Sequence, residues 1–268
     1  MTTRRKFLRN GAGIAAAAFL APVTRAQSSR SNPVVTTVHG KVRGFADTEI
    51  SVFRGVRYGA DTSLNRFCPP RQPDPWDSTI DCFEYGASAP QRSPTEAASE
   101  DCLFLNVWTP SVNDERKRPV MFYIHGGAYN HGSGSSPLYD GSALARKADV
   151  VVVTVNHRLN AFGYLYLQRL APDRFPDSGN SGQLDLVLAL QWVRDNIGAF
   201  GGDPNRVLAF GQSGGGAKIA TMMAMPAAKG LFQRAASMSG QQVTASGPAN
   251  ATERTLAYLD TLGVKPND

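Results

Sequence analysis

A run of β-branched residues at positions 150–155 restricts the fold of this chain more than any other feature of the sequence. It contains five valines and one threonine, with no charged residue between them. β-Branched side chains favour extended backbone, and a strand that is apolar on both sides must be buried on both faces. Buried strands of this kind occur inside parallel sheets that are covered by helices. The run therefore predicts the central strand of an α/β protein.

Segments with the patterns of strands and helices alternate on both sides of this run. Strands are expected at 34–38, 41–45, 50–53, 103–108, 119–124, 207–210 and 234–238, and helices at 184–197, 215–225 and 252–262. The first two strands flank His39-Gly40 and should form a hairpin. A Pro-rich segment at 67–94 is expected to be a loop, and its length indicates either a functional role or packing over the core. The alternation favours a mostly parallel central sheet with helices on both faces.

The first 26 residues have the features of an export signal. The pair Arg4-Arg5 is followed by Lys6-Phe7-Leu8, then by an apolar stretch at 11–23 and by small residues before position 27. The paired arginines favour a twin-arginine signal over an ordinary secretory signal or a retained anchor. The apolar stretch is too short for a comfortable membrane span. We therefore expect a bacterial protein that is exported to the periplasm or the medium, with a mature part at 27–268 and no stable membrane span.

The net charge of +6 does not indicate binding to nucleic acid. Five of the 28 basic residues lie in the first 26 positions, which contain no Asp or Glu, so the remainder has a charge near +1. It also has no Lys/Arg run with interleaved aromatic residues. The three cysteines, Cys68, Cys82 and Cys102, leave at least one thiol unpaired, and none has a metal-ligand spacing with histidine. We expect no metal, no cofactor and no nucleic-acid partner.

The motif Gly211-Gln212-Ser213-Gly214-Gly215 indicates a nucleophilic serine. It follows an expected strand and opens an expected helix, which is the context of a serine held on a tight, strained turn. Gly211 and Gly215 would supply the room that the turn needs, and the helix start favours negative charge at Ser213. The motif alone is weak, because a chain with 26 glycines can contain it as an ordinary Gly-rich loop.

A second motif, His125-Gly126-Gly127-Ala128, directly follows the expected strand at 119–124. When a hydroxyl attacks an ester carbonyl, fixed donors around the developing oxyanion contribute about 3–4 kcal/mol each. The backbone N–H groups of Gly127, Ala128 and Gly214 are the expected donors. The alternative is a simple tight turn, but the glycine turn and the serine motif follow two successive strands in the order that an oxyanion hole requires.

These residues resemble the type-B carboxylesterase family, which includes the cholinesterases. Residues 100–108 (Glu-Asp-Cys-Leu-Phe-Leu-Asn-Val-Trp) and the stretch from 200–205 (Phe-Gly-Gly-Asp-Pro-Asn) to the serine motif resemble its signatures, and 156–159 (Asn-His-Arg-Leu) also fits. The resemblance runs from about residue 33 to the C-terminus. It implies an α/β-hydrolase fold, ester hydrolysis through an acyl-enzyme, and structural salt bridges between Arg66 and Glu100 and between Arg158 and Asp185.

Two departures from the family pattern affect specificity and disulfides. Family members usually carry Glu before the nucleophile, where this chain has Gln212, so a choline ester is disfavoured. The family often pairs the cysteine at the position of Cys102 with an upstream cysteine, whose position here resembles Ala89. Cys102 is therefore expected to be free, or paired with Cys82 or Cys68.

The third departure concerns the general base. The chain order in this fold is nucleophile, acid and histidine, but all four histidines precede Ser213. The resemblance places the acid and the histidine beyond residue 268. His131 is an alternative base because it follows the glycine turn, although a solvent-facing loop histidine explains it as well. His125 is expected to support the turn, and no Ser-x-x-Lys arrangement offers a lysine base.

We therefore interpret residues 27–268 as the N-terminal part of a serine carboxylesterase domain, apparently truncated at the C-terminus, for a small-molecule carboxylic ester. The chain alone should be inactive or feeble, and a missing C-terminal half is a candidate partner. The alternative function is a non-catalytic, cholinesterase-like binding protein. Proteins of that kind generally lose the nucleophile, whereas Ser213 is present here.

Overall fold

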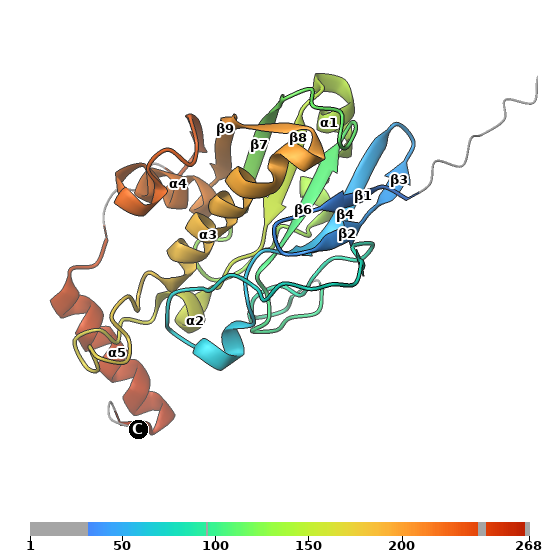
Figure 1. The fold of residues 1–268 in the computed structure, drawn as a ribbon. Helices are drawn as coiled ribbons and strands as arrows, with labels where there is room; N and C mark the ends of the chain where they lie inside the picture. Colours follow the sequence, from blue (N-terminus) through green and yellow to red (C-terminus); the bar gives the residue numbers. More distant parts are fainter. Residues whose placement is uncertain (1–31, 95, 241–244, 266–268) are drawn as a thin grey trace, which may run out of the picture.

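The computed structural model of the chain describes residues 32–94, 96–240 and 245–265. The expected export signal at 1–26 lies outside this part. The described residues form a central sheet with the strand order β10-β9-β7-β8-β6-β4-β3 (Figure 1). Its strands are β3 (Phe45–Asp47), β4 (Ile50–Arg57), β6 (Phe104–Thr109), β7 (Arg118–Ile124), β8 (Val151–Val155), β9 (Gly202–Gln212) and β10 (Arg234–Met238).

The sheet is parallel in one half and antiparallel in the other. Strands β8, β7, β9 and β10 pair in parallel, whereas β8 with β6, β6 with β4, and β4 with β3 are antiparallel. The expected mostly parallel arrangement thus holds for the C-terminal strands, and the sheet as a whole is mixed. The short link between β3 and β4 explains one antiparallel pair, because so few residues can join only antiparallel neighbours.

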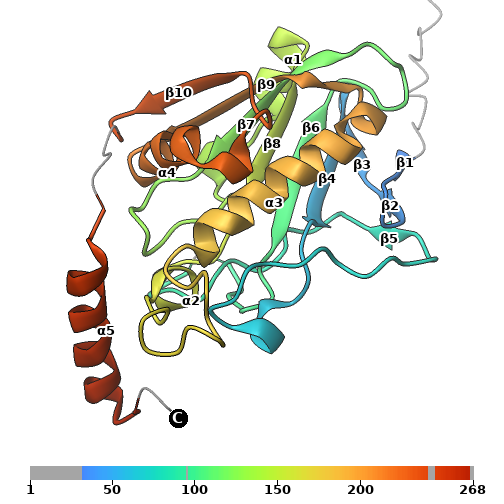
Figure 2. The same cartoon turned by 60° about the vertical axis from the view of Figure 1, so that its left-hand side comes forward.

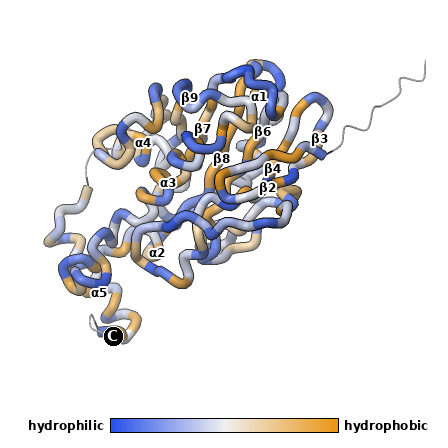
Figure 3. Tube along the Cα trace, viewed as in Figure 1, coloured by the Kyte–Doolittle hydropathy of each residue, from blue (hydrophilic) through white to orange (hydrophobic). Residues whose placement is uncertain are grey.

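Strand β8 is buried on both faces, as its β-branched sequence predicted. Val151, Val153 and Val155 belong to the larger apolar core, whereas Val150 and Val152 belong to a second cluster on the opposite face. This division follows the two-residue period of a strand. Figure 3 shows the hydrophobic segments concentrated along the central strands.

Helices cover both faces of the sheet. Helices α3 (Ser181–Asn196) and α4 (Gly214–Ala224) pack on the face of the larger core, and α1 (Ser142–Ala148) packs on the other face against Trp108 and Val152 (Figure 2). The short helix α2 (Asn160–Tyr164) follows β8. Helix α5 (Pro248–Leu262) lies at one end of the molecule, with Thr255 and Leu259 as its buried residues.

A small sheet precedes the central one. Strands β1 (Val34–Thr36) and β2 (Lys41–Arg43) form the expected antiparallel hairpin, and β5 (Ile80–Asp81) adds to β2 in parallel. Strand β5 lies within the Pro-rich segment at 67–94. That segment also places Trp76 against the ring of His39, with the ring centroids 6.2 Å apart.

Candidate active site

Ser213 lies at the junction of β9 and α4, as its motif predicted. Its backbone has φ +54° and ψ −122°, a conformation that L-residues rarely adopt. The Ser213 N–H donates to Met238 O at 2.7 Å, and Ser213 O accepts from Ala217 N at 3.0 Å. The following strand and the first turn of α4 therefore hold the serine on its strained turn, with its side chain partly exposed.

Gly211 and Gly215 supply the room that this turn requires. A Cβ atom on Gly211 would lie 2.6 Å from Ile124 O and 2.9 Å from the carbonyl carbon of Gly215. A Cβ atom on Gly215 would collide with the same Ile124 carbonyl oxygen. Strands β7 and β9 pair in parallel up to Ile124 and Gly211, so the end of β7 presses directly against the serine turn.

The glycine turn after β7 meets the serine turn. A Cβ atom on Gly126 would lie 2.9 Å from Gln212 O and 3.5 Å from Ser213 Cβ, and one on Gly214 would lie 2.6 Å from Ala128 Cα. Two segments that are about 85 residues apart in the sequence therefore contact each other through backbone. The structure brings together all of the residues that the two motifs singled out, with Gln212 exposed beside them.

The expected oxyanion donors are backbone N–H groups without an acceptor among the residues that the structure describes. Among the described residues, neither the Gly127 N–H nor the Ala128 N–H donates a hydrogen bond. Gly214 is the first residue of α4, so its N–H has no acceptor within the helix. Gly127 and Ala128 adopt positive φ values of 88° and 52°. The turn thus leaves unpaired donors next to Ser213.

Two buried histidines lie beneath the turn. The rings of His125 and His157 stack with centroids 4.8 Å apart and an interplanar angle of 10°. Each Nδ1–H donates to a carbonyl, Gly126 O at 2.8 Å and Arg158 O at 2.9 Å, and each Nε2 lacks a partner among the described residues. Burial lowers the pKa of His125 to about 3 and that of His157 well below its usual range. Both rings are therefore neutral supports for the backbone.

His131 lies on the exposed side of the same turn. Its N–H donates to Gly127 O at 3.2 Å, and its Cδ2 is 3.0 Å from where a Cβ of Gly127 would lie. No hydrogen bond joins His131 to Ser213 within the described residues. His131 and Tyr129 line a cavity of about 1040 Å³, whose wall also includes Phe162, Tyr166 and Arg254.

Lys218 is a site residue that the sequence reasoning missed. It is completely buried on α4, and its Nζ donates to Ala128 O at 2.5 Å and to Gly214 O at 3.3 Å. The available signal was a lysine among small and apolar residues in the helix that the serine motif opens.

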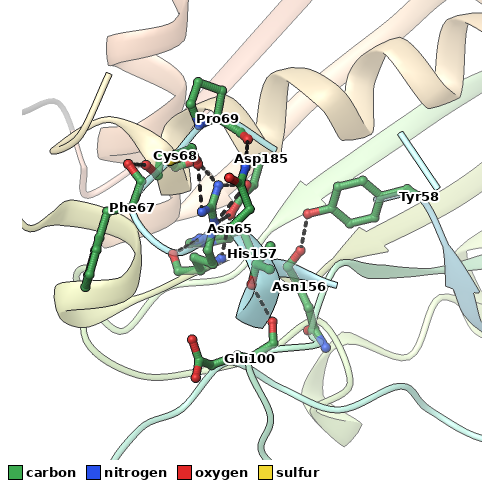
Figure 4. A network of polar contacts seen from close by, with 12 residues as sticks. Tyr58, Asn65, Phe67, Cys68, Pro69, Glu100, Asn156, His157 and Asp185 are labelled. Atoms are coloured by element: carbon green, nitrogen blue, oxygen red, sulfur yellow. Dashed lines mark hydrogen bonds and ion pairs between the residues drawn. The ribbon is translucent and has the colours of Figure 1, made fainter. Parts of the chain in front are cut away.

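The two expected salt bridges are present. Arg66 and Glu100 form a two-pronged pair, with both N···O distances 2.6 Å. Arg158 and Asp185 are both buried, with distances of 2.7 and 2.9 Å, and the Asp185 carboxylate also accepts from Arg158 N. Figure 4 shows Asp185 within a network that includes Cys68, whose carbonyl accepts from the Arg158 guanidinium. This network ties α3 to the segment after β8.

The structure decides between the alternatives for the cysteines. Cys68, Cys82 and Cys102 are all free thiols, so Cys102 has no disulfide partner. Within the part of the chain that the structure describes, no helix combines the length and apolarity needed to cross a membrane. In the same described residues, no three His, Cys, Asp or Glu side chains gather in a way that could hold a metal ion.

This arrangement, a strained serine at a strand-to-helix turn on an α/β sheet, defines the α/β-hydrolase class. The model of the carboxylesterase family matches residues 31–265. The chain is 43% identical over 243 residues to para-nitrobenzyl esterase of Bacillus subtilis, an alignment that covers 87% of this chain and 49% of that protein. It is 35% identical over 240 residues to acetylcholinesterase of Leptinotarsa decemlineata, which covers 77% of this chain and 38% of that protein.

Solved structures agree with this result. The carboxylesterase of Geobacillus stearothermophilus superposes with a TM-score of 0.85 at 44% identity, over 88% of this chain and 49% of that one. An esterase from Clostridium hathewayi, described as able to hydrolyse aliphatic aromatic polyesters, superposes with a TM-score of 0.80 at 42% identity, over 87% of this chain and 49% of that one. The chain belongs to the carboxylesterase family, and it spans about half the length of the relatives it matches.

Proposed function

We propose that the chain carries the nucleophile and the oxyanion hole of a serine carboxylic-ester hydrolase. The observation that carries this proposal is the contact between the serine turn and the glycine turn. Ser213 stands on a strained turn directly beside unpaired N–H groups, which is the geometry that acyl transfer to a serine needs. Membership of the carboxylesterase family supports the same reaction class.

In the proposed reaction, Ser213 Oγ attacks the carbonyl carbon of a small-molecule ester. The negative charge that develops on the carbonyl oxygen is stabilised by the N–H groups of Gly127, Ala128 and Gly214. Collapse of the tetrahedral intermediate expels the alcohol and leaves an acyl group on Ser213. A water molecule then attacks the acyl-enzyme and releases the carboxylic acid.

The general base for these steps is proposed to come from residues outside this sequence. His125 and His157 are excluded because both are buried, use Nδ1 for a backbone carbonyl and have lowered pKa values. His131 lies close but makes no hydrogen bond to Ser213. No histidine follows Ser213, where this fold places one. The chain alone is therefore expected to hydrolyse esters feebly, and a C-terminal half with an acid and a histidine is the proposed partner.

We propose that an apolar or aromatic group of the ester occupies the cavity beside the glycine turn, whose wall includes Tyr129 and His131 but not Ser213. Its volume of about 1040 Å³ would hold a drug-sized molecule, and Tyr129, Phe162, Tyr164 and Tyr166 contribute to its wall. Para-nitrobenzyl esterase, named for an aromatic alcohol, is among the similar proteins. The exposed Gln212 carries no charge to hold a cationic ester, so choline esters are disfavoured.

Export is proposed from the twin-arginine pattern of the first 26 residues. Expression in a bacterium, followed by fractionation, should place the mature protein in the periplasm or the medium. Replacement of Arg4 and Arg5 by lysine should retain it in the cytoplasm. Equal export of both forms would contradict a twin-arginine route.

The proposed chemistry is tested by hydrolysis of a short-chain p-nitrophenyl ester. We expect slow release of p-nitrophenol with acyl transfer to Ser213 in the parent chain and in the control Ser63→Ala, whose serine is exposed and distant in the sequence, and no acyl transfer to this position in Ser213→Ala. Removing triad members from a serine hydrolase leaves roughly 10³–10⁴-fold acceleration over water from the oxyanion hole and binding alone, so Ser213→Ala is expected to keep a residual rate, and the acyl group on Ser213 is the serine-dependent signal. Fast turnover that is lost in His131→Ala would show that His131 is the base. Absence of any acyl group on Ser213 in the folded parent chain would refute the proposal.

A further inference from the structure

Lys218 is a buried cation without a carboxylate partner. Its side chain is completely inaccessible to solvent, and it forms no salt bridge with any residue that the structure describes. Burial lowers the pKa of its ammonium to about 7, and no neighbouring acid opposes that shift. Buried lysines are unusual, since a charge taken out of water is costly unless it is paired. Apolar packing alone therefore does not explain a lysine at this buried position.

The contacts of Lys218 are concentrated on the candidate oxyanion hole. Its Nζ donates to Ala128 O at 2.5 Å and to Gly214 O at 3.3 Å, and it lies 4.4 Å from the centroid of the Tyr129 ring. Ala128 belongs to the turn after β7, whereas Gly214 begins α4. One ammonium group thus joins the two segments whose N–H groups would bind the oxyanion.

We propose that Lys218 is a positioning residue of the oxyanion hole, which fixes the glycine turn against the start of α4 and adds positive potential at Ser213. This inference rests on the proposed ester hydrolysis. The two bonds set the distance between the Ala128 and Gly214 segments, and both segments contribute donors. A positive charge held in a poorly solvated region acts over several ångströms, so it favours the negative charge that develops near Ser213.

The buried titratable groups around Lys218 stay neutral over the pH range in which Lys218 changes its charge. His125 and His157, at the ends of β7 and β8, have pKa values lowered by burial and by the Lys218 charge. Burial raises the pKa of Tyr129, whose ring lies beside Nζ. His131 lies on the exposed side of the glycine turn. A pH-dependent effect that disappears with Lys218 can therefore be assigned to its ammonium.

The test compares the whole chain with Lys218→Met and Lys218→Arg. The rate of Ser213 acylation by p-nitrophenyl acetate is measured from pH 6 to 9, with the adduct located by peptide mass spectrometry. Hydrogen exchange is followed in the peptide that contains Asn130 and His131, whose N–H groups both donate to Gly127 O. Methionine matches lysine in length without a charge, and arginine keeps its charge across this range.

We expect acylation at pH 6 to be about tenfold slower in Lys218→Met, because an indirect effect should be smaller than the loss of an oxyanion donor. The acylation rates of the parent chain and Lys218→Met should become nearly equal at pH 9, where Lys218 is neutral. Lys218→Arg should still be acylated faster than Lys218→Met at pH 9. The Asn130–His131 peptide should exchange faster in the methionine variant. If Lys218→Met does not fold, the parent chain is compared with Lys218→Arg. The acylation rate of the parent chain should then fall relative to that of Lys218→Arg as the pH rises from 6 to 9, and a constant ratio of the two rates would contradict the inference.

Two results would overturn the inference. One is an equal rate of Ser213 acylation in the parent chain and Lys218→Met at every pH. The other is unchanged hydrogen exchange in the glycine turn of Lys218→Met. Absence of any Ser213 adduct in the parent chain would refute the proposed function instead, and hydrogen exchange would still decide whether Lys218 holds the turn. A merely structural lysine would change stability without a pH-dependent effect on acylation.

Discussion

Two buried cations, in two regions on the same face of the sheet, differ in how their charge is balanced. Arg158, after β8, is matched by the buried Asp185 carboxylate on α3 and by backbone carbonyls. Lys218, on α4 beside Ser213, contacts two carbonyl oxygens and the face of Tyr129, and within the described part of the chain it has no carboxylate partner. The stacked rings of His125 and His157 lie between these regions, since His157 precedes Arg158 and His125 precedes the glycine turn.

The difference separates a contribution to stability from a contribution to function. The Arg158 network satisfies both charges, and it joins α3 to the central sheet as a structural element. The Lys218 ammonium is incompletely satisfied and lies where negative charge is expected to develop. Groups with perturbed pKa values gather at functional sites for this reason. Mutations in the two regions should therefore change stability in opposite directions.

The largest expected effect is loss of the Asp185 charge. Asp185→Asn leaves Arg158 buried without its counter-charge, and breaking a buried pair typically lowers the free energy of unfolding by about 3–5 kcal/mol. Urea unfolding of the parent and variant measures this change. The matched control is Asp195→Asn, whose pair with Arg194 is exposed and should contribute less than about 1 kcal/mol. Similar losses for the two variants would contradict the structural role of the Arg158 network.

The histidine stack should make the fold sensitive to acid. The folded-state pKa of His125 is lowered to about 3, and that of His157 is also lowered, so both stay neutral in the fold. The unfolded chain binds protons below its usual histidine pKa near 6.5, so stability is complete above about pH 6.5 and falls as the pH drops toward 3. Between pH 6.5 and 5 we expect a loss of about 2 kcal/mol per histidine.

Unfolding in urea at a series of pH values measures this acid sensitivity. The His157→Asn variant removes one of the two groups, so its stability should fall less steeply with acid than that of the parent. Equal slopes for the two proteins over this interval would show that the histidines are not held neutral by the fold.

Replacement of Lys218 should have the opposite sign to replacement of Asp185. Lys218→Met removes a buried charge whose pKa is lowered from 10.5 to about 7, so we expect the free energy of unfolding at pH 6–7 to rise by about 1–3 kcal/mol. Because the folded pKa is depressed, parent stability should increase with pH between about 7 and 10.5, and the variant should lack this increase. The control Lys229→Met, at an exposed position, should change stability by less than about 0.5 kcal/mol. A loss of stability in Lys218→Met would contradict the view that Lys218, unlike Arg158, lowers the stability of the fold.

The smallest expected effect concerns the pair of Arg66 and Glu100. The Arg66 side chain is 55% exposed, so solvent screens the pair despite its two-pronged geometry. Glu100→Gln should lower the free energy of unfolding by about 1 kcal/mol or less, as measured by urea unfolding in low salt. A loss of unfolding free energy as large as that of Asp185→Asn would show that burial does not determine which of the two salt bridges contributes more to stability.

The sequence predicted the parts of this fold that depend on local pattern. The β-branched run at 150–155 identified β8, and the two glycine motifs placed Ser213 and the turn at 125–128 at the ends of strands. Short helices α1 and α2 were missed because segments of seven and five residues have too few turns for a period. The antiparallel half of the sheet was missed because pairing between distant strands leaves no local pattern.

The role of Lys218 could not be read from the sequence for a related reason. A lysine in a helix is usually exposed, and only the packing of α4 against the glycine turn buries this one. Likewise, sequence order suggested His125 as a support for the turn, but its stacking on His157 depends on the parallel neighbours β7 and β8. Residue type located the nucleophile, whereas three-dimensional contact identified what holds it.

The most direct test of this account is the fate of an acyl group on Ser213. The chain is mixed with p-nitrophenyl acetate, and intact mass and peptide maps are recorded over time, beside Ser213→Ala. We expect one acetyl group to accumulate slowly on Ser213 and to persist, because the proposed oxyanion hole would assist attack, whereas the general base that would activate water for release is proposed to lie outside this sequence. Rapid turnover without accumulation, or acetylation that does not involve Ser213, would contradict the account.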